Sequence, residues 1–211
     1  GGVLFLDELA EFHRDALEAL RQPLEEGTIT VVRARAFFEF PARFTLLAAM
    51  NPCPCGHLGD SRRACRCPLP LVERYRSRVS GPLLDRIDLH VEVPALRLQD
   101  LRGPGAERSE TVAARVAGAR QRQRRRFPSA HPAPVNASLQ AREILESCAL
   151  DAAGQSLIET AFERLGFSAR ALSRVLKVAR TIADLGESDE IRTPHLAEAI
   201  QYRALDRRLQ A

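Results

Sequence analysis

Two short apolar runs that each end in polar side chains constrain the fold of this chain more than any other feature. Residues 3–6 (VLFL) lead into Asp7 and Glu8, and residues 44–50 (FTLLAAM) lead into Asn51. Apolar runs of this length, with little polar alternation, are typical of strands buried in a parallel sheet that helices cover. The sequence therefore predicts an α/β fold in which two carboxylates and an amide lie where buried strands end.

Around these strands the sequence predicts a hairpin, a cysteine-rich loop and a helical region. A helix is expected over residues 15–25, ending at Gly27, and β-rich residues around a short basic stretch predict a hairpin over residues 28–40. The alternation of apolar and polar residues over 87–93 predicts one further strand. We expect three parts in all: an α/β part over residues 1–103 that includes a loop rich in Pro, Gly and Cys over 53–70, a linker helix and proline-rich connector over 104–135, and an all-α part over 136–211.

Composition excludes several classes of protein. No apolar run reaches the roughly 18–20 residues that span a bilayer, and the apolar start lacks the basic region and cleavage site of a signal peptide. The formal net charge is only +4, so charge alone does not identify a nucleic-acid partner. An odd count of five cysteines without a secretory signal favours a reducing compartment, and we expect a cytoplasmic protein with no membrane partner.

The polar side chains at the strand ends suggest a site for phosphate chemistry. Four apolar residues before Asp7 and Glu8 form a pattern in which the first carboxylate holds Mg²⁺ on nucleotide phosphates and the second polarises the attacking water. Asn51 could orient the same water. The alternatives are a plain strand followed by a helix whose first turn favours acids, and an Asn-Pro pair that only starts a turn.

Two arginines are candidates for contacts with phosphate. Arg86 precedes a predicted strand and could reach the γ-phosphate of a nucleotide on a neighbouring subunit, or it could belong to a surface charge cluster with Asp85 and Asp88. Arg170 lies two residues into a helix that Ser168 can cap, where a guanidinium beside the positive helix end suits a phosphate. A solvated arginine is the alternative there, since the chain has thirty arginines.

Four of the five cysteines lie close together in the sequence, in the pairs Cys53/Cys55 and Cys65/Cys67. Tetrahedral zinc takes four such thiolate ligands, and a loop without a core of its own is stabilised by binding it. One residue rather than the usual two separates the cysteines of each pair, and His57 could serve as a spare ligand. The sequence thus predicts a structural zinc site, with four reduced thiols in a stiff loop as the alternative.

Arginines also mark two candidate surfaces for DNA. Arg33 and Arg35 lie at the tip of the predicted hairpin and are the better candidates. A helix predicted over residues 109–127 carries six arginines that could contact phosphates, at positions 115, 120, 122, 124, 125 and 126. A solvated helix is the alternative for this second set, because Phe127 is the one aromatic residue nearby that could stack on bases.

Four segments, taken together and in order, closely resemble one protein family. They are GGVLFLDEL from residue 1, LLAAMNPCPCG from residue 46, GPLLDRIDLHVEVP from residue 81 and SARALSRVLKVARTIADL from residue 168. With them the chain resembles the magnesium-chelatase-like AAA+ ATPases, and among these the competence-associated, ComM-like branch, over nearly its whole length. The resemblance implies Walker B roles for Asp7 and Glu8 and a sensor 1 role for Asn51. It also implies that Arg86 is an arginine finger and that Arg170 is sensor 2.

The resemblance carries further expectations about fold and activity. The hairpin over residues 28–40 would be the pre-sensor-1 hairpin, which projects toward the pore of ring helicases, and residues 136–211 would form a helical lid. The whole protein would be a hexameric ring that uses ATP and Mg²⁺ to drive DNA remodelling, as in branch migration during natural transformation. Its partners would then be further copies of itself and DNA.

One motif of that family is missing from this sequence. No G-x-x-x-x-G-K-[ST] phosphate-binding loop (Walker A) occurs, and the one lysine, Lys177, lies in a predicted helix. We therefore expect the C-terminal part of a longer protein, starting at Walker B, that hydrolyses no ATP by itself. The expected parallel sheet would lack the Walker A strand and expose strand edges.

Three other functions are open to the sequence. A chelatase-type motor subunit for metal insertion into a porphyrin fits the same family, although the cysteine loop argues against it. That loop also suits a zinc-stabilised nucleic-acid-binding module with no role in ATP hydrolysis. An interaction domain with a dead ATPase core is the third alternative, and the complete set of five motif residues argues against such decay.

Overall fold

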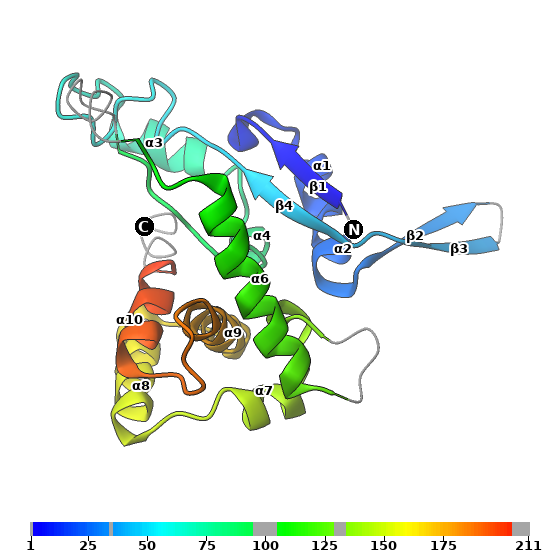
Figure 1. Cartoon of the computed structure of the whole chain (residues 1–211). Helices are drawn as coiled ribbons and strands as arrows, with labels where there is room; N and C mark the ends of the chain where they lie inside the picture. The colour runs from blue at the N-terminus through cyan, green and yellow to red at the C-terminus, as the bar shows by residue number, and fades with distance from the viewer. Residues whose placement is uncertain (1, 34–35, 95–104, 129–133, 204–211) are drawn as a thin grey trace. The chain divides into compact units, whose positions relative to one another are not determined.

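The computed structural model describes residues 2–33, 36–94, 105–128 and 134–203, which form two compact units (Figure 1). The first unit holds the described residues up to Ile87 and residues 92–94, and it mixes helices with two small sheets. The second unit holds residues 88–91 and those from 105 to 203, and it is helical. A mixed α/β part followed by a helical part is therefore confirmed.

A two-stranded parallel sheet positions the polar strand ends of the first unit. Strand β1 (Gly2–Leu6) pairs with β4 (Phe44–Ala48), with Leu4 opposite Leu46. The pairing continues past the strands, because the Ala49 amide donates to the Leu6 carbonyl at 2.9 Å. The predicted parallel arrangement of these two strands is confirmed.

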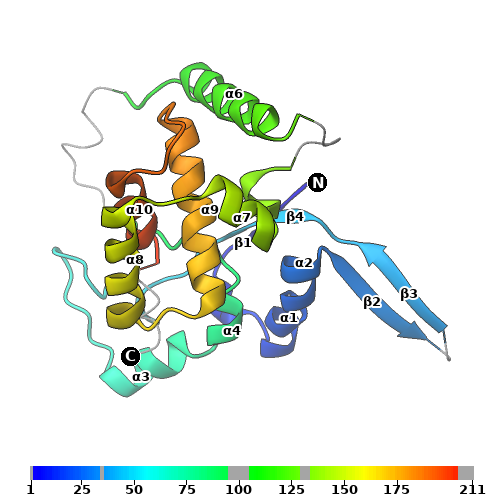
Figure 2. The same cartoon turned by 90° about the horizontal axis from the view of Figure 1, so that it is seen from below.

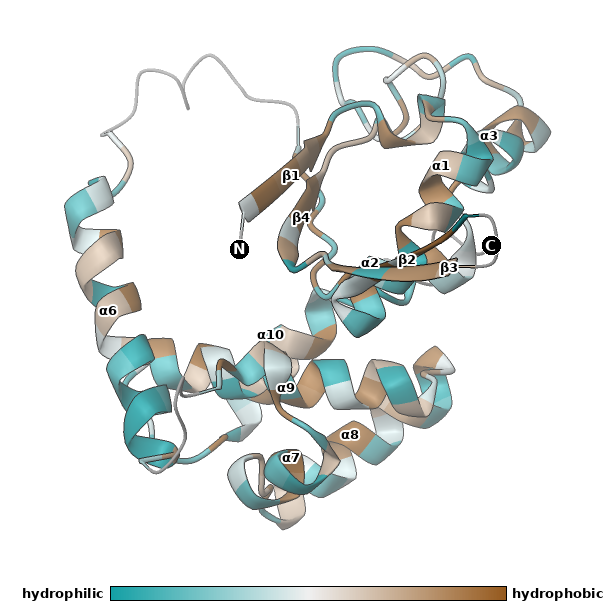
Figure 3. Cartoon of the chain, turned by 90° about the vertical axis from the view of Figure 1, so that its right-hand side faces the viewer, coloured by the Kyte–Doolittle hydropathy of each residue, from teal (hydrophilic) through white to brown (hydrophobic). Residues whose placement is uncertain are grey.

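Only one face of this sheet is covered within the described residues. Leu6 and Ala48 pack against a core that includes Leu9, Leu17 and Leu83. The opposite face is exposed, and β1 is hydrophobic for most of its length (Figure 3); the exposed apolar side chains there are Val3, Phe5 and Leu47. The prediction of strands buried on both faces is thus wrong for the described part of the first unit, because the apolar side chains of the second face are exposed.

Two short helices, α1 (Arg14–Ala19) and α2 (Arg21–Glu26), replace the single helix predicted over residues 15–25. The helix breaks at Leu20 because Pro23 has no amide proton to donate to the carbonyl of residue 19. The predicted stop at Gly27 is confirmed, since its φ of 72° is a left-handed conformation that glycine adopts without strain.

The predicted hairpin is confirmed as an antiparallel ribbon of β2 (Thr28–Arg33) and β3 (Ala36–Pro41). After β4 the chain runs through the cysteine-rich loop into α3 (Leu69–Arg76) and α4 (Gly81–Leu84). A short 3-10 turn, η1 (Leu9–Glu11), follows β1 and contributes Leu9 and Ala10 to the core.

The strand predicted over residues 87–93 is not present. Asp88 forms an ion pair with Arg174, and the backbone amide of His90 donates to the Tyr202 carbonyl at 2.9 Å. An alternating sequence forms a strand only when the backbone of a neighbouring strand is there to pair with it. Here the polar groups of the segment bind helical residues instead.

Helix α9 (Ala169–Leu185) is the centre of the second unit, and Figure 2 shows the other helices around it. Its predicted cap is confirmed, because the Ser168 hydroxyl accepts a hydrogen bond from the Ala171 amide at 3.1 Å. Its apolar side packs into a core with Val175, Ala179 and Leu196. The elements around it are α6 (Ser109–Arg126), η2 (Asn136–Ser138), α7 (Ala141–Ser147), α8 (Ala152–Leu165) and α10 (Thr193–Gln201).

A buried carboxylate links three segments of this unit. Asp184 of α9 is fully buried, accepts hydrogen bonds from Arg126 Nη2 at 2.5 Å and from Asn136 Nδ2 at 2.8 Å, and forms an ion pair with Arg180 at 3.1 Å. Burial of a charge is tolerated when it is paired and hydrogen-bonded in this way. The network fixes α6 and η2 against α9.

Replacing Asp184 with alanine is expected to lower the free energy of unfolding by about 3–5 kcal/mol, because two guanidinium groups lose their buried partner. Urea unfolding followed by circular dichroism measures the loss. Asp189→Ala is the matched control, since that carboxylate pairs with Arg122 at 2.6 Å but is almost fully exposed, so its loss should cost less than about 1 kcal/mol. Equal losses in the two variants would contradict the prediction.

No helix in the described part of the chain is both long enough and apolar enough to span a membrane.

Candidate functional site

The carboxylates and the amide singled out in the sequence lie at the same edge of the parallel sheet. Asp7 and Glu8 follow β1, and Asn51 lies three residues beyond the end of β4. The segments that follow β1 and β4 still pair at this edge, because the Leu9 amide donates to the Ala49 carbonyl at 2.8 Å. Asp7, Glu8 and Asn51 are exposed there, so a ligand has access to all three.

Glu8 has a strained backbone. Its φ of 52° and ψ of 46° are left-handed, which costs a residue with a side chain roughly 1–3 kcal/mol. Its amide donates to Asp7 Oδ1 at 2.9 Å. Strain of this kind is often found where a side chain must point in a functional direction. The sequence contains no signal for it, because glutamate is not enriched in this conformation.

The backbone around Asn51 is held by α3. Burial raises the pKa of Tyr75, and a hydrogen bond with the Asn51 backbone opposes that rise. Arg76 Nε donates to the Pro52 carbonyl at 3.1 Å. The side-chain amide of Asn51 lies near Gly56, where a Cβ atom would come within 3.8 Å of its oxygen. The sheet edge and the start of the cysteine-rich loop are therefore one connected region.

The four sequence-predicted cysteines are brought together. The Sγ–Sγ distances are 3.4 Å for Cys53–Cys55, 3.7 Å for Cys53–Cys65 and 3.7 Å for Cys55–Cys65, and all four sulfur atoms, including that of Cys67, lie within 4.8 Å of one another. A tetrahedral zinc ion with bonds of about 2.3 Å places its sulfur ligands about 3.8 Å apart. The cluster fits that geometry, whereas a disulfide would need about 2.05 Å.

The protein lowers the pKa of one thiol of the cluster, Cys55, and raises the pKa of Cys65 and Cys67, because the thiols hydrogen-bond to one another. A hydrogen bond from the His57 backbone, supported by the Cys67 and Cys53 thiols, lowers the pKa of the Cys55 thiol to about 6. Thiolate is the form that binds metals. The loop can turn back between the two cysteine pairs because Gly56 adopts a φ of 77°.

Arg86 does not lie in the exposed charge cluster that the sequence left open. Its side chain is only 8% exposed, and Nη2 forms an ion pair with Glu25 of α2. Nη1 donates to the Pro82 carbonyl at 2.6 Å. Sequence reasoning missed Glu25, because 61 positions separate the two residues. Asp88, the expected neighbour in the cluster, pairs instead with Arg174.

The remaining candidates lie on helices and on the hairpin. Arg170 is exposed in the first turn of α9, in the second unit. Arg33 is exposed at the end of β2. Arg35 lies outside the described residues. The structure thus groups Asp7, Glu8 and Asn51 at one edge of the sheet. Arg33 and Arg86 belong to other segments of the first unit, and Arg170 belongs to the second unit.

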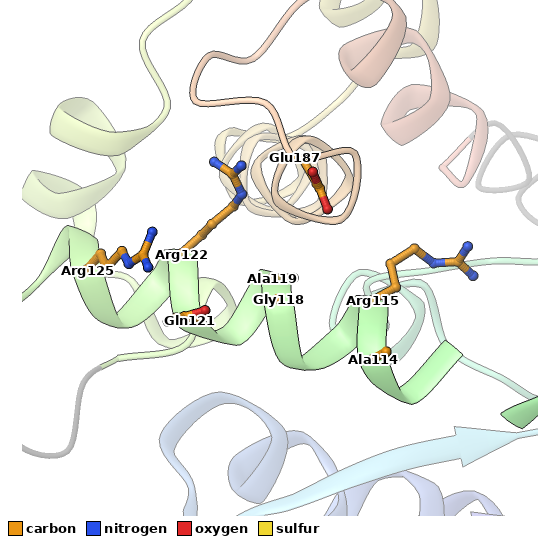
Figure 4. A pocket seen from close by; sticks show the side chains of 8 residues that line it. All are labelled: Ala114, Arg115, Gly118, Ala119, Gln121, Arg122, Arg125 and Glu187. Carbon is orange, nitrogen blue, oxygen red and sulfur yellow. The ribbon is translucent and has the colours of Figure 1, made fainter. Parts of the chain in front are cut away.

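The arginine-rich helix α6 uses several of its charges within its own unit. Arg115 pairs with Glu107 at 2.7 Å, Arg122 with Asp189 at 2.6 Å, and Arg126 with buried Asp184. A shallow pocket of about 180 Å³ lies between α6 and Glu187, and Arg115, Arg122 and Arg125 help to line it (Figure 4). These pairings agree better with an ordinary solvated helix than with a surface reserved for phosphates.

Two family sequence models match the chain. One is described as magnesium chelatase, subunit ChlI, and covers residues 1–101. The other is described as the C-terminal part of the same subunit and covers residues 106–203. Together they account for nearly the whole chain.

Curated relatives are similar over the same length. Competence protein ComM of Haemophilus influenzae and the uncharacterised protein YifB of Escherichia coli are each 47% identical over 99% of the chain. An uncharacterised protein of Mycobacterium tuberculosis is 37% identical over 96% of the chain. The chain spans about 40% of the length of each of these relatives.

Proposed function

We propose, from the premise that the chain belongs to the magnesium chelatase ChlI family, that it is part of an AAA+ ATPase which couples ATP hydrolysis to DNA remodelling. The observation that carries the proposal is the meeting of Asp7, Glu8 and Asn51 at one edge of a parallel sheet. Ligands of open α/β sheets bind beyond the carboxyl ends of the strands, where these side chains lie.

The three residues divide the chemistry of phosphoryl transfer to water. Asp7 would hold Mg²⁺, which offsets the charge on the nucleotide phosphates. Glu8 accepts a proton from the attacking water, and the Asn51 amide orients that water by a hydrogen bond. The strained turn at Glu8 fixes the direction of its carboxylate relative to Asp7. A carboxylate that is already oriented loses less conformational freedom when it meets the attacking water.

Arginines complete the site in this proposal. Arg86 reaches the nucleotide of the neighbouring subunit, and Arg170 reports the γ-phosphate to a lid over residues 136–211. Residues 1–103 then belong to the ATPase core, and residues 104–135 connect the two parts. Because Arg86 is paired with Glu25 in the single chain, its guanidinium exchanges a carboxylate for a phosphate when a ring, such as a hexamer, assembles.

The four-cysteine cluster is proposed as a structural zinc site. Four thiolates fill a tetrahedral shell and leave no position for water, so the ion would link the loop and take no part in hydrolysis. Cys53 is buried and follows Asn51 by two residues, so the ion would also anchor the chain directly after the sheet edge.

DNA is the proposed substrate of the motor. ComM of Haemophilus influenzae is named a competence protein, which fits branch migration during natural transformation. Arg33 and Arg35 at the hairpin tip would contact the phosphate backbone.

Replacing Glu8 with glutamine tests the catalytic assignment. In the full-length protein we expect turnover of ATP to fall by about 10²- to 10⁴-fold, because the amide cannot accept the proton of the attacking water. Nucleotide binding should remain. Glu11→Gln is the matched control, since Glu11 lies one turn further on and pairs with Arg78 at 2.7 Å. Unchanged ATPase activity in Glu8→Gln would sink the assignment.

A motor subunit for metal insertion into a porphyrin is the second candidate, because both matching family models describe a magnesium chelatase subunit. The two functions differ in what accelerates ATP hydrolysis by the full-length protein. Acceleration by DNA supports the remodelling function, whereas acceleration only with a porphyrin and partner subunits supports the chelatase function.

A further inference from the structure

The β2–β3 hairpin exposes an unusual amount of apolar surface. On one face, strand pairing places Ile29 opposite Phe40 and Val31 opposite Phe38. Phe38 and Phe40 are about half exposed, and β2 and β3 are hydrophobic for most of their length (Figure 3). We call this face the aromatic face; about half of the surface of each of these two phenylalanines is open to solvent.

The two faces of the ribbon differ in their surroundings. On the opposite face, Thr30 bonds to Gln22 of α2, with Gln22 Nε2 donating to the hydroxyl at 3.1 Å. Arg33 lies on the aromatic face, since it is two positions beyond Val31 on the same strand. The aromatic face therefore combines two rings, two aliphatic side chains and one cation, whereas the opposite face exposes one ring, Phe37, on the same side as the Glu39 carboxylate.

We propose that the aromatic face of the hairpin binds the bases of single-stranded DNA, with Phe38 and Phe40 stacking on bases and Arg33 meeting the phosphate backbone. The proposal rests on the DNA function proposed above and names the part of DNA that is recognised. Bases in a duplex hide their faces in the stack, so rings presented in this way select unpaired strands.

The spacing of the two rings supports this occupant. Phe38 and Phe40 are two residues apart on one strand, which separates their attachment points by about 6.6 Å. A base that stacks between two rings separates them by about twice the 3.4 Å stacking distance, which is close to the spacing of these attachment points. Aromatic side chains on an open sheet face bind single-stranded nucleic acid in this manner in other folds.

The charge near the ribbon is complementary to a nucleic-acid strand. The sequence over residues 28–43 contains three arginines and one glutamate, a net charge of +2. A neighbouring copy of the chain is the competing occupant, since apolar surfaces also join subunits. An apolar contact between subunits does not need a cation such as Arg33 on the same face. The basic tip therefore favours a nucleic-acid strand over a second copy of the chain.

Anisotropy titration of the full-length protein with a fluorescein-labelled thymidine oligonucleotide tests the proposal. Phe38→Ala should weaken binding by about 5- to 150-fold, the loss typical of one base–aromatic stack. Its salt dependence should stay unchanged, because no phosphate contact is lost. Arg33→Ala should instead lower the slope of log Kd against log salt by about one. Phe162→Ala, an exposed phenylalanine of α8, is the matched control and should bind as the unchanged protein does.

An abasic oligonucleotide separates stacking from a general apolar effect. It should bind the unchanged protein and Phe38→Ala equally, and Phe38→Tyr should restore most of the affinity for the thymidine strand. The proposal is overturned if Phe38→Ala binds thymidine strands normally, or if it disrupts ring assembly on size exclusion while DNA binding per ring is kept. If the unchanged protein binds neither strand, the DNA function itself fails and this proposal with it.

Discussion

Replacing Arg86 with alanine is expected to lower the ATPase turnover of the full-length protein by about 10³- to 10⁵-fold, the contribution typical of an arginine finger. In its proposed role the guanidinium offsets charge that develops on the γ-phosphate in the transition state, and alanine supplies no such charge. Substrate binding should change far less than turnover. Arg21→Ala is the matched control, because Arg21 lies on the same α2 helix as Glu25 and makes a half-exposed pair with Glu18.

Mixing two inactive variants tests whether Arg86 acts across a subunit boundary. Glu8→Gln subunits still offer Arg86, and Arg86→Ala subunits still offer Glu8. Mixed rings should therefore regain some interfaces with both residues and recover part of the activity. A mixture as inactive as its components would contradict action on a neighbouring subunit.

Loss of the Glu25 ion pair is the other way in which Arg86→Ala could lower activity, since the Arg86 side chain is 8% exposed and paired. Glu25→Gln breaks the same pair but keeps the guanidinium. If thermal unfolding shows similar destabilisation in both variants, the additional loss of turnover in Arg86→Ala reports the missing contact with phosphate.

Removing zinc is the second change with a large expected effect. Protein purified without chelators or metal-affinity resin should contain one zinc ion per chain, because four thiolates complete one tetrahedral shell. Structural zinc sites bind with apparent free energies on the order of 10 kcal/mol, so a strong chelator should unfold the loop over residues 53–70. Elemental analysis measures the metal, and thiol titration before and after chelation measures exposure of the cysteines.

Cysteine variants separate this site from the other thiol of the chain. Cys53→Ser should lose the ion, since Cys53 is the buried member of the cluster. Cys148→Ala should keep it, because Cys148 is buried among the helices of the second unit. Zinc-free protein with four freely titratable thiols in the loop would contradict the zinc site and support the alternative, a stiff loop of reduced cysteines.

Features set by neighbouring residues could be predicted from the sequence. The stop at Gly27, the cap at Ser168 and the hairpin depend on contacts within a few positions. Features set by distant partners could not. The strand expected over 87–93 is absent because of the backbone groups that lie beside that segment, whereas the break at Leu20 has a local cause in Pro23.

The candidate site divides in the same way. Asp7 and Asn51 could be placed at one sheet edge because parallel strands bring their carboxyl ends together, and the cysteine pairs could be placed by spacing. The burial of Arg86 depends on Glu25, which lies on a helix far away in the sequence. No pattern of charges predicts such a pair, because any of many carboxylates could have supplied it.

Because the backbone at Glu8 is left-handed, selection for thermostability and selection for activity favour different residues at this position. Glycine adopts this conformation at no steric cost, so a library of variants ranked by thermostability alone would enrich glycine there. On the proposed role of Glu8 in activating water, a library ranked by ATP turnover would retain glutamate. Adaptation of such proteins to high temperature must therefore gain its stability elsewhere in the chain, since the substitution that relieves this strain also removes the carboxylate.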